Sequence, residues 1–406
     1  MSQAAKKDTP EQAEYRAYCR KWIEENRPEE PDFRLPLQAI EVMDEGVKEY
    51  LQTWQKKAYD GGLIGVDYPT EYGGGGKSGM QTIANQELAA GDVPYFINVI
   101  GLGMCAPTIF HHASEELKRR FIPQILSGEM IWCQGFSEPG AGSDLASCNT
   151  SVVKKGDKWI VNGHKVWTSL AHYAGWMIAL VRTSNHDKYK GLSFFVLPVQ
   201  DTKGVTIRPL IKITGETGFN EVIFEDLEVP DSYRLDDVGK GWTVAMTTLT
   251  HERGAGTLVG PNTGMSARGA TRTQRLLELA KKCRRNGKPA IDDPFIRDRI
   301  ALVAVWEEGL AQNQRRAKVP GLTDDPMRIP LQGKVSFTEL AQLAATVALE
   351  IEGQASSLYI ADPMAPDSGT WPLTFLNSYG NTIAAGTSEV QRNILGERVL
   401  GMAKSK

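Results

Sequence analysis

The fold of this protein is decided by the stretch from Trp176 to Pro198, WMIALVRTSNHDKYKGLSFFVLP. Two apolar runs, 176–181 and 192–198, flank a polar segment that contains Ser, Asn, Asp and Gly. Short apolar runs bounded by turn residues are typical of buried β-strands. Similar runs lie at 158–161 and 221–230, and no long helical pattern separates the four. We therefore predict an antiparallel sheet, a small barrel or sandwich, rather than a parallel βαβ array.

Turn and helix signals surround this β region. Asn162-Gly163 lies between apolar runs and predicts a tight hairpin. Ser114 is a good N-cap for a helix with an acidic first turn and a basic last turn, and Pro123 lies just beyond the predicted end of that helix. Apolar residues at helical spacing occupy both ends of the chain. The predicted helices cover 13–25, 50–59, 114–121, 273–283, 294–314 and 337–351.

These patterns predict a mainly α protein with a central β domain. We expect an N-terminal helical domain over 1–131, the β domain over 132–239 and a C-terminal helical bundle over 240–406. The length of 406 residues is ample for a large core.

Composition excludes several classes of protein. The net charge is −3, from 46 basic and 49 acidic residues, and a nucleic-acid binder would show a basic excess. No apolar stretch is long enough to cross a bilayer, and the N-terminus lacks the apolar segment of a secretory signal. The five cysteines are scattered without a CxxC pair, so we expect no disulfide framework and a cytoplasmic location.

Three further patterns suggest sites that we do not favour. The segment 101–106 fits GxGxxA, but no βαβ repeat surrounds it and Pro107 follows at once. His111 and His112 point about 100° apart on a helix and cannot bind one metal ion together, so a structural or surface role is expected. The basic cluster 281–285 either attracts phosphate or is the basic C-terminus of a helix that Asn286-Gly287 ends.

Three segments place glycines, hydroxyls or an aromatic ring where a ligand could bind. The first, 137–144 (SEPGAGSD), suits close approach to a planar or phosphorylated ligand, or is a tight loop with local caps. The second, 162–169 (NGHKVWTS), carries a Trp and two hydroxyls, and such a Trp more often belongs to a core. The third, 387–393 (TSEVQRN), begins the last helix, whose N-terminus either binds an anion or is merely capped.

Taken together and in this order, the three segments resemble the acyl-CoA dehydrogenase family. Further matching segments are 224–230 (FEDLEVP), 239–246 (GKGWTVAM) and Glu252-Arg253. The resemblance covers nearly the whole chain, from Tyr15 to Met402. It implies an N-terminal helical domain, a central β domain and a C-terminal four-helix bundle, and these agree with the zones predicted above.

The resemblance also implies a cofactor, FAD, and a reaction. Flavin-dependent members remove two hydrogens from the Cα–Cβ bond of an acyl-CoA thioester and yield the 2-enoyl-CoA, a step of β-oxidation and of acyl-CoA degradation. A carboxylate base takes the α-proton and flavin N5 accepts the hydride. The residues implied in FAD binding are Gln134, Phe136, Ser137, Gly142, Ser143, Trp167, Thr168, Ser169, Arg284, Glu350, Gly353, Thr387 and Glu389.

The base is displaced from its commonest position in the family. Many relatives carry Glu directly before the Gly-Thr of the last-helix loop, where this chain has Ala385. The isovaleryl-CoA and long-chain types instead place it directly before an arginine, which here is Glu252 before Arg253. The resemblance therefore implies Glu252 as the catalytic base; the alternative is an ordinary ion-paired helix Glu. Ser143, Arg253, Ala385 and Gly386 are the implied substrate-binding residues, with the Ala385 N–H donating to the thioester carbonyl.

The resemblance further implies a homotetramer, a dimer of dimers, that passes electrons to electron-transfer flavoprotein. We expect no nucleic acid, no membrane insertion and no metal. In the family's R-x-x-F-G motif the arginine is shifted and the aromatic is absent, since the chain reads Cys-Arg-Arg-Asn-Gly at 283–287. This variant favours dicarboxylic, cyclic, aromatic-ring or steroid side-chain acyl groups. Two alternatives are a flavin monooxygenase or oxidase on the same fold, and a non-catalytic partner subunit of a mixed tetramer.

Overall fold

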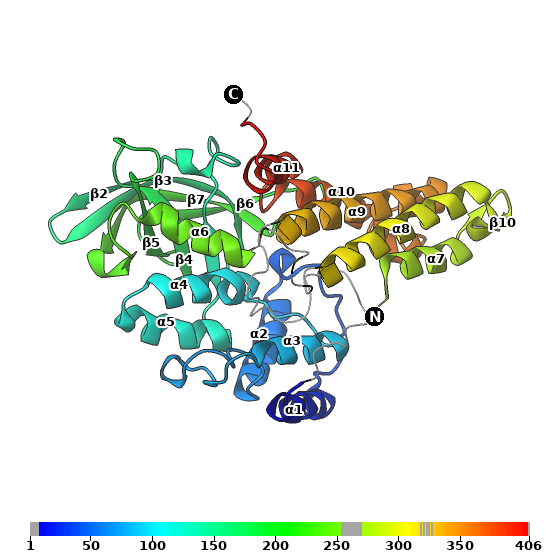
Figure 1. Cartoon of the computed structure of the whole chain (residues 1–406), viewed down its shortest axis with the longest axis horizontal. Coiled ribbons are helices and arrows are strands. Elements are labelled where there is room, and N and C mark those ends of the chain that lie inside the picture. The colour runs from blue at the N-terminus through cyan, green and yellow to red at the C-terminus, as the bar shows by residue number, and fades with distance from the viewer. Residues whose placement is uncertain are drawn as a thin grey trace. The chain divides into compact units, whose positions relative to one another are not determined.

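The computed structural model describes residues 8–252, 270–316, 319, 321, 325 and 328–404. The chain divides into two compact units, Met1–Gly269 and Ala270–Lys406. Figure 1 labels the elements of both. The bounds of the three predicted domains are not tested by this division and stay a prediction.

The first, second and fifth helices of the first unit match those predicted over 13–25, 50–59 and 114–121, whereas the third and fourth were not predicted. Thr9 caps the first helix, Asp44 caps the second and Ser114 caps the fifth, each by accepting a backbone N–H with its side chain. The helices are α1 (Pro10–Asn26), α2 (Glu45–Asp60), α3 (Gln81–Ala90), α4 (Ala106–His112), α5 (Glu115–Ser127) and α6 (Gly241–Glu252).

Helix α5 runs further than the sequence predicts. It continues through Pro123 to Ser127, although an internal proline costs about 3 kcal/mol of helix stability. Ile122, Ile125 and Leu126 are fully buried around that proline. Their burial, worth roughly 1.5–3 kcal/mol for each side chain, outweighs the lost hydrogen bond.

The sheet has the order β6-β7-β3-β2-β4-β5-β8, with β1 paired to β4 outside this path. The predicted antiparallel arrangement is confirmed for most pairs, but β4 also pairs in parallel with β1 and β2. The strands are β1 (Trp132–Gly135), β2 (Ser151–Lys155), β3 (Lys158–Ser169), β4 (Trp176–Arg182), β5 (Leu192–Pro198), β6 (Val205–Leu210), β7 (Phe219–Pro230) and β8 (Arg234–Leu235).

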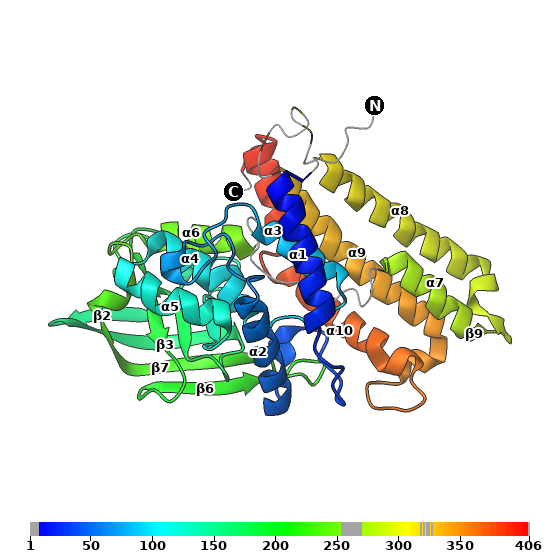
Figure 2. The same ribbon diagram turned by 90° about the horizontal axis from the view of Figure 1, so that it is seen from below.

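The central strands are buried on both faces, which explains their nearly continuous apolar sequence. Ile178 and Leu180 of β4 belong to one core, which includes residues of α5. Met177 and Ala179 belong to a second core, which includes Val47 and Leu51 of α2. Figures 1 and 2 show α4 and α5 side by side over one face of the sheet.

The predicted hairpin at Asn162-Gly163 is wrong. Strand β3 runs straight through these residues, and the chain turns earlier, at Gly156, whose φ is +63°. A Cβ on Gly163 would lie 2.5 Å from the Thr150 hydroxyl, so glycine is needed here for close packing between strands. Asn162 bonds the backbone and side chain of Asp226 across a bulge between β3 and β7.

The second unit is helical. The predicted helices are confirmed as α7 (Arg272–Lys282), α8 (Pro294–Arg316) and α9 (Arg328–Glu352), which are followed by α10 (Thr370–Ile383) and α11 (Ser388–Ile394). Leu279, Ile300 and Val347 belong to one shared core. The basic cluster ends α7 at Lys282, while Asn286-Gly287 forms the turn between the short strands β9 (Arg284–Arg285) and β10 (Lys288–Pro289).

Candidate active site

The first predicted ligand segment leaves the end of β1 as a fixed loop. Glu138 and Ala141 exchange both backbone hydrogen bonds at 3.0 Å, and Val166 of β3 donates its N–H to Ser137 O at 2.9 Å. Phe136 is buried edge-on against Phe194. The loop is therefore attached to β3, which carries the second segment.

A buried ion pair holds this loop from beneath. Lys165 of β3 is fully buried, and its Nζ donates to Glu138 Oε1 at 2.7 Å, Leu180 O at 2.7 Å and Phe136 O at 3.1 Å. Glu138 also accepts the N–H groups of Asn149 and Thr150. Sequence reasoning missed this pair; the available signal was a lysine in a strand whose neighbours are buried.

The charge state of Glu138 follows from these contacts. Burial by itself raises the pKa of Glu138, but the Lys165 charge and the hydrogen bond from Asn149 N–H outweigh it and hold the pKa below its usual value. The carboxylate of Glu138, which ties this loop to Lys165, is therefore ionised.

The second segment presents an aromatic ring to the outside. Trp167 has a φ of +57°, at a register shift between β3 and β7, and it is 58% exposed beside Phe219. A left-handed tryptophan is strained, and such strain clusters at functional sites. The next residue, Thr168, is fully buried and its hydroxyl has no hydrogen-bond partner among the described residues.

These features fit the flavin that the resemblance implies. An exposed indole offers an apolar face to a planar ring, and Thr168 offers an unsatisfied hydroxyl. Gly140 and Gly142 have no atom within 4 Å of an added Cβ, so this rim of the loop is open. Ser143 is exposed and Gln134 and Ser169 are half-buried on the same set of strands and loops.

Glu252 is the last described residue of α6 and is half-buried. Its helix is held against α4 by Thr248, whose buried hydroxyl shares a 2.9 Å hydrogen bond with that of Thr108. Arg253, the predicted neighbour, lies outside the described residues.

The second unit contains the third segment. Ala385 has a φ of +55° and Gly386 one of +89°. Gln391 Nε2 donates to Ala385 O at 2.8 Å, and Lys334 Nζ donates to Gly386 O at 2.7 Å. Thr387 caps α11 and accepts from Val390 N–H, and the pKa of Glu389 is lowered by its own backbone N–H and by Thr387. The predicted helix start is confirmed, and the backbone of the loop before it is strained at Ala385.

Among the remaining predicted cofactor residues of this unit, Glu350 and Arg284 make hydrogen bonds to other protein groups. Arg299 binds both carboxylate oxygens of Glu350, at 2.8 and 3.1 Å, and Arg284 donates to Gly287 O at 3.1 Å. Gly353 follows α9 with a φ of +59°. Their role toward a cofactor stays a prediction.

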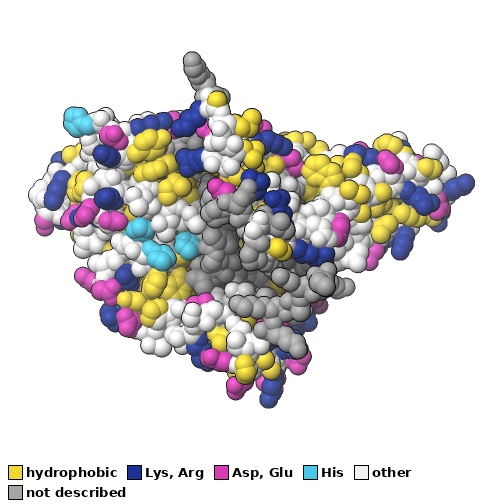
Figure 3. Space-filling view, viewed as in Figure 1, with side chains coloured by type: hydrophobic (Ala, Val, Ile, Leu, Met, Phe, Trp, Pro, Cys, Tyr) yellow, Lys and Arg dark blue, Asp and Glu magenta, His cyan; other side chains and the backbone are white. Residues whose placement is uncertain are grey.

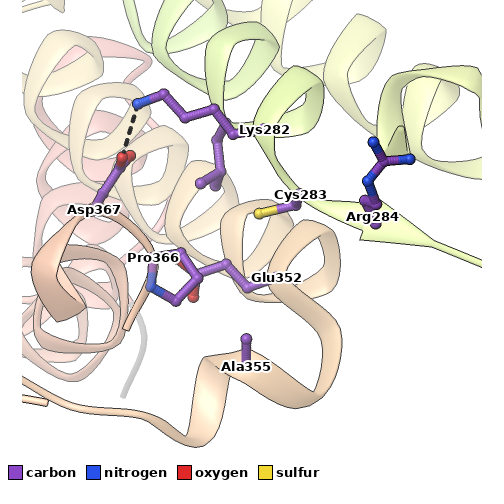
Figure 4. A pocket seen from close by; sticks show the side chains of 8 residues that line it. Lys282, Cys283, Arg284, Glu352, Ala355, Pro366 and Asp367 are labelled. Atoms are coloured by element: carbon purple, nitrogen blue, oxygen red, sulfur yellow. Dashed lines mark hydrogen bonds and ion pairs between the residues drawn. The ribbon is translucent and has the colours of Figure 1, made fainter. Parts of the chain in front are cut away.

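A cavity of about 370 Å³ lies beside Arg284 (Figure 4). Lys282 and Asp367 form an ion pair at 3.0 Å on its wall. Glu352 is only 6% exposed, and neither of its carboxyl oxygens has a hydrogen-bond partner in the part of the chain described. Burial, and secondly the Asp367 charge, raise the pKa of Glu352 to about 7. Glu352 falls within the stretch 350–354 that the resemblance implies for the cofactor site, but its burial and its lack of a described partner could not be read from the sequence.

Comparison with protein families covers almost the entire chain. The N-terminal, middle and C-terminal domain models of acyl-CoA dehydrogenases match residues 9–129, 133–227 and 239–400.

Curated relatives carry the same family name. The chain is 35% identical over 398 residues to the acyl-CoA dehydrogenase IpdE1 of Mycobacterium tuberculosis, and the match covers 96% of this chain and 98% of that protein. It is 30% identical over 305 residues to a glutaryl-CoA dehydrogenase of Desulfococcus multivorans, with coverage of 72% and 76%.

Solved structures agree with these relatives. The ChsE4-ChsE5 complex of Mycobacterium tuberculosis matches with a TM-score of 0.76 at 26% identity, over the full length of both chains. The Tcur3481-Tcur3483 steroid acyl-CoA dehydrogenase matches with a TM-score of 0.78 at 26% identity, over 98% of this chain and 99% of that one. Among the described residues, no helix is both long and apolar enough to span a membrane.

Proposed function

Because the chain belongs to the acyl-CoA dehydrogenase family, whose members are flavin-dependent oxidoreductases acting on CH–CH bonds, we propose that Glu252 is its catalytic base. The proposed reaction converts an acyl-CoA thioester into its 2-enoyl-CoA. The observation that carries the proposal is the pair of positions 252 and 385: a carboxylate ends α6, and Ala385 stands where many relatives have the base.

A carboxylate is required because the α-proton of a thioester is weakly acidic. Glu252 removes this proton, and the Ala385 N–H donates to the thioester oxygen, where negative charge develops. The left-handed backbone of Ala385 and its hydrogen bond from Gln391 fix the direction of that N–H. Bound FAD would supply the acceptor for the hydride that leaves Cβ.

The residues of the first unit provide the proposed flavin contacts. Trp167 would pack against the isoalloxazine, and Ser137, Thr168 and Ser169, together with Gln134, Phe136, Gly142 and Ser143, would complete the flavin site of this unit. The Lys165–Glu138 pair does not touch the flavin in this proposal but keeps the loop in place. In the second unit, Thr387 and Glu389, with Arg284, Glu350 and Gly353, are the proposed cofactor residues.

The test of the base is Glu252→Gln, with Glu225→Gln as the matched control on an exposed part of β7. A panel of acyl-CoA thioesters is added under anaerobic conditions while flavin absorbance is followed. We expect E252Q to bind flavin but to bleach it at least about a hundredfold more slowly, which is the rate factor that a general base typically contributes. E225Q should bleach flavin at the rate of the parent protein. Near-normal bleaching by E252Q would refute the assignment.

The same panel tests the two alternatives. Rapid reoxidation of the reduced protein by air would favour an oxidase or monooxygenase. A colourless protein that gains neither flavin nor activity on adding FAD would favour a non-catalytic subunit.

The assembly and the electron acceptor are also proposals. The predicted homotetramer competes with a mixed assembly, because the ChsE4-ChsE5 structure is a complex of two different chains. Native mass spectrometry distinguishes the homotetramer from the mixed assembly. The protein is expressed alone and together with related acyl-CoA dehydrogenase chains from the same genome. Electron-transfer flavoprotein stays the proposed acceptor, tested by its reduction under anaerobic turnover. The resemblance to a steroid acyl-CoA dehydrogenase supports a ring-bearing acyl group over a straight chain.

A further inference from the structure

Two helices of the first unit carry an unusual cluster of imidazole rings beside the proposed base. Helices α4 and α6 are joined by the buried Thr108–Thr248 hydrogen bond. Three residues further along each helix, the rings of His111 and His251 stack with centroids 5.9 Å apart and planes 17° apart. Figure 3 shows histidine side chains gathered on this face.

Glu252 lies on the same side of α6 as this contact. Residues four apart share one face of a helix, so Glu252 is on the face of Thr248, which is turned toward α4. Glu252 and the stacked rings therefore lie at the C-terminal ends of the two paired helices.

The rings have different partners. His112 is engaged: its Nε2 lies 2.8 Å from the Thr247 hydroxyl and its Nδ1 lies 3.3 Å from an Asp236 carboxylate oxygen. His111 is exposed, and across residues 8–252 its ring nitrogens make no hydrogen bond. His111 thus presents a ring nitrogen without a described protein partner beside His251, the residue that precedes the proposed base.

The electrostatic surroundings keep this ring neutral. Partial burial, then the neighbouring His112 and Lys118, lower the pKa of His111 below its ordinary value. Lys118 is itself held by Glu115 at 2.9 Å. A neutral imidazole has one N–H donor and one acceptor nitrogen, which suits an uncharged oxygen. A second carboxylate in the substrate would lie near the negative charge of Glu252.

We propose that His111 is a specificity-determining residue that donates a hydrogen bond to an uncharged oxygen, a ketone or hydroxyl, on the acyl group of the substrate. This inference rests on the proposed function, because it places the acyl group between Glu252 and α4. A plain alkyl chain would leave the imidazole donor without a partner when it covers the ring, and an unsatisfied donor is costly.

The test compares CoA thioesters of one chain length as substrates. The enzyme is the flavin-loaded protein together with any partner subunit that co-purifies with it. The probes are octanoyl-CoA, a series of keto-octanoyl-CoA thioesters with the ketone at successive carbons from C4 to C7, which leaves the reacting Cα–Cβ bond intact, and octanedioyl-CoA. The measured quantity is kcat/KM for each keto substrate divided by that for octanoyl-CoA. We expect the best keto substrate to exceed octanoyl-CoA by roughly tenfold, the value of one net hydrogen bond.

The variants separate recognition from folding. His111→Phe should remove the keto preference, His111→Gln should restore part of it because an amide N–H remains, and His186→Ala, on an exposed loop, should leave it unchanged. Equal rates for keto and alkyl substrates, an unchanged ratio in H111F, or a preference for octanedioyl-CoA would overturn the inference. Failure of the proposed function looks different, because no acyl-CoA of the wider panel, ring-bearing thioesters included, would then bleach the flavin, or E252Q would bleach it normally.

Discussion

Replacing Lys165 by methionine should destabilise this protein more than any comparable change of a charged residue in the same strand. Lys165 is fully buried and donates to one carboxylate and two carbonyls at 2.7 to 3.1 Å. The variant leaves Glu138 buried without its cation, and it also leaves two carbonyl oxygens without their donor. Removal of one partner from a buried pair costs about 3–5 kcal/mol of unfolding free energy.

The matched control is Lys158→Met on the same strand. Lys158 also makes a 2.7 Å ion pair, with Glu228, but the two side chains are 52% and 59% exposed. Solvent screens an exposed pair, so this ion pair adds little to stability and burial is the main difference between the two variants. Urea unfolding, monitored by circular dichroism, gives the unfolding free energies of both variants. The amount of flavin bound per chain shows whether the loop at 137–144 keeps its flavin-binding conformation. Equal losses in K165M and K158M would refute the reasoning.

The effect should also depend on pH. The folded pKa of Glu138 is held below its unfolded value of about 4.3, so the pair stabilises the parent protein above that pH and loses its effect as pH falls through the folded pKa. In K165M the buried carboxylate has no cation and gains from protonation. The gap between the two proteins should therefore narrow on acidification from about pH 7 to pH 4, and Glu138→Gln in the K165M background should recover part of the loss.

Two further predictions concern the second unit. The pKa of Glu352 is raised to about 7, so this residue should make the unit less stable as pH rises from about 4.3 toward 7; Glu352→Gln should remove that dependence and stabilise the protein by on the order of 2–3 kcal/mol at about pH 8, whereas a parallel pH profile in E352Q would contradict it. Ala385→Gly should relieve the strain of a φ of +55° and raise the unfolding free energy by about 1 kcal/mol, while Gly386→Ala, whose Cβ would meet Gln391 Nε2 at 2.7 Å, should lower it; thermal melting of both variants decides, and a destabilised A385G would be the contrary outcome.

Several features of the protein follow from its sequence alone because they depend on short-range patterns. The apolar runs at 176–181 and 192–198 became β4 and β5, and Ser114 and Thr387 cap the helices that they were expected to begin. Helix spacing, capping and strand composition act within a few residues, so the sequence contains them directly. The family resemblance, which the family models and curated relatives confirm, also rests on such local motifs.

Other features were decided only by the tertiary structure. Asn162-Gly163 has the sequence of a turn but lies inside β3, because Asn162 pairs with Ser151 of β2 and Gly163 pairs with Phe224 of β7. Lys165 meets Glu138, and His111 meets His251, only because the strands and helices that carry them pack face to face. Such pairs join residues far apart in the chain, and their geometry depends on which faces are buried together. Local patterns therefore determine the elements of this protein, while the packing of those elements determines which side chains meet and which charges are buried.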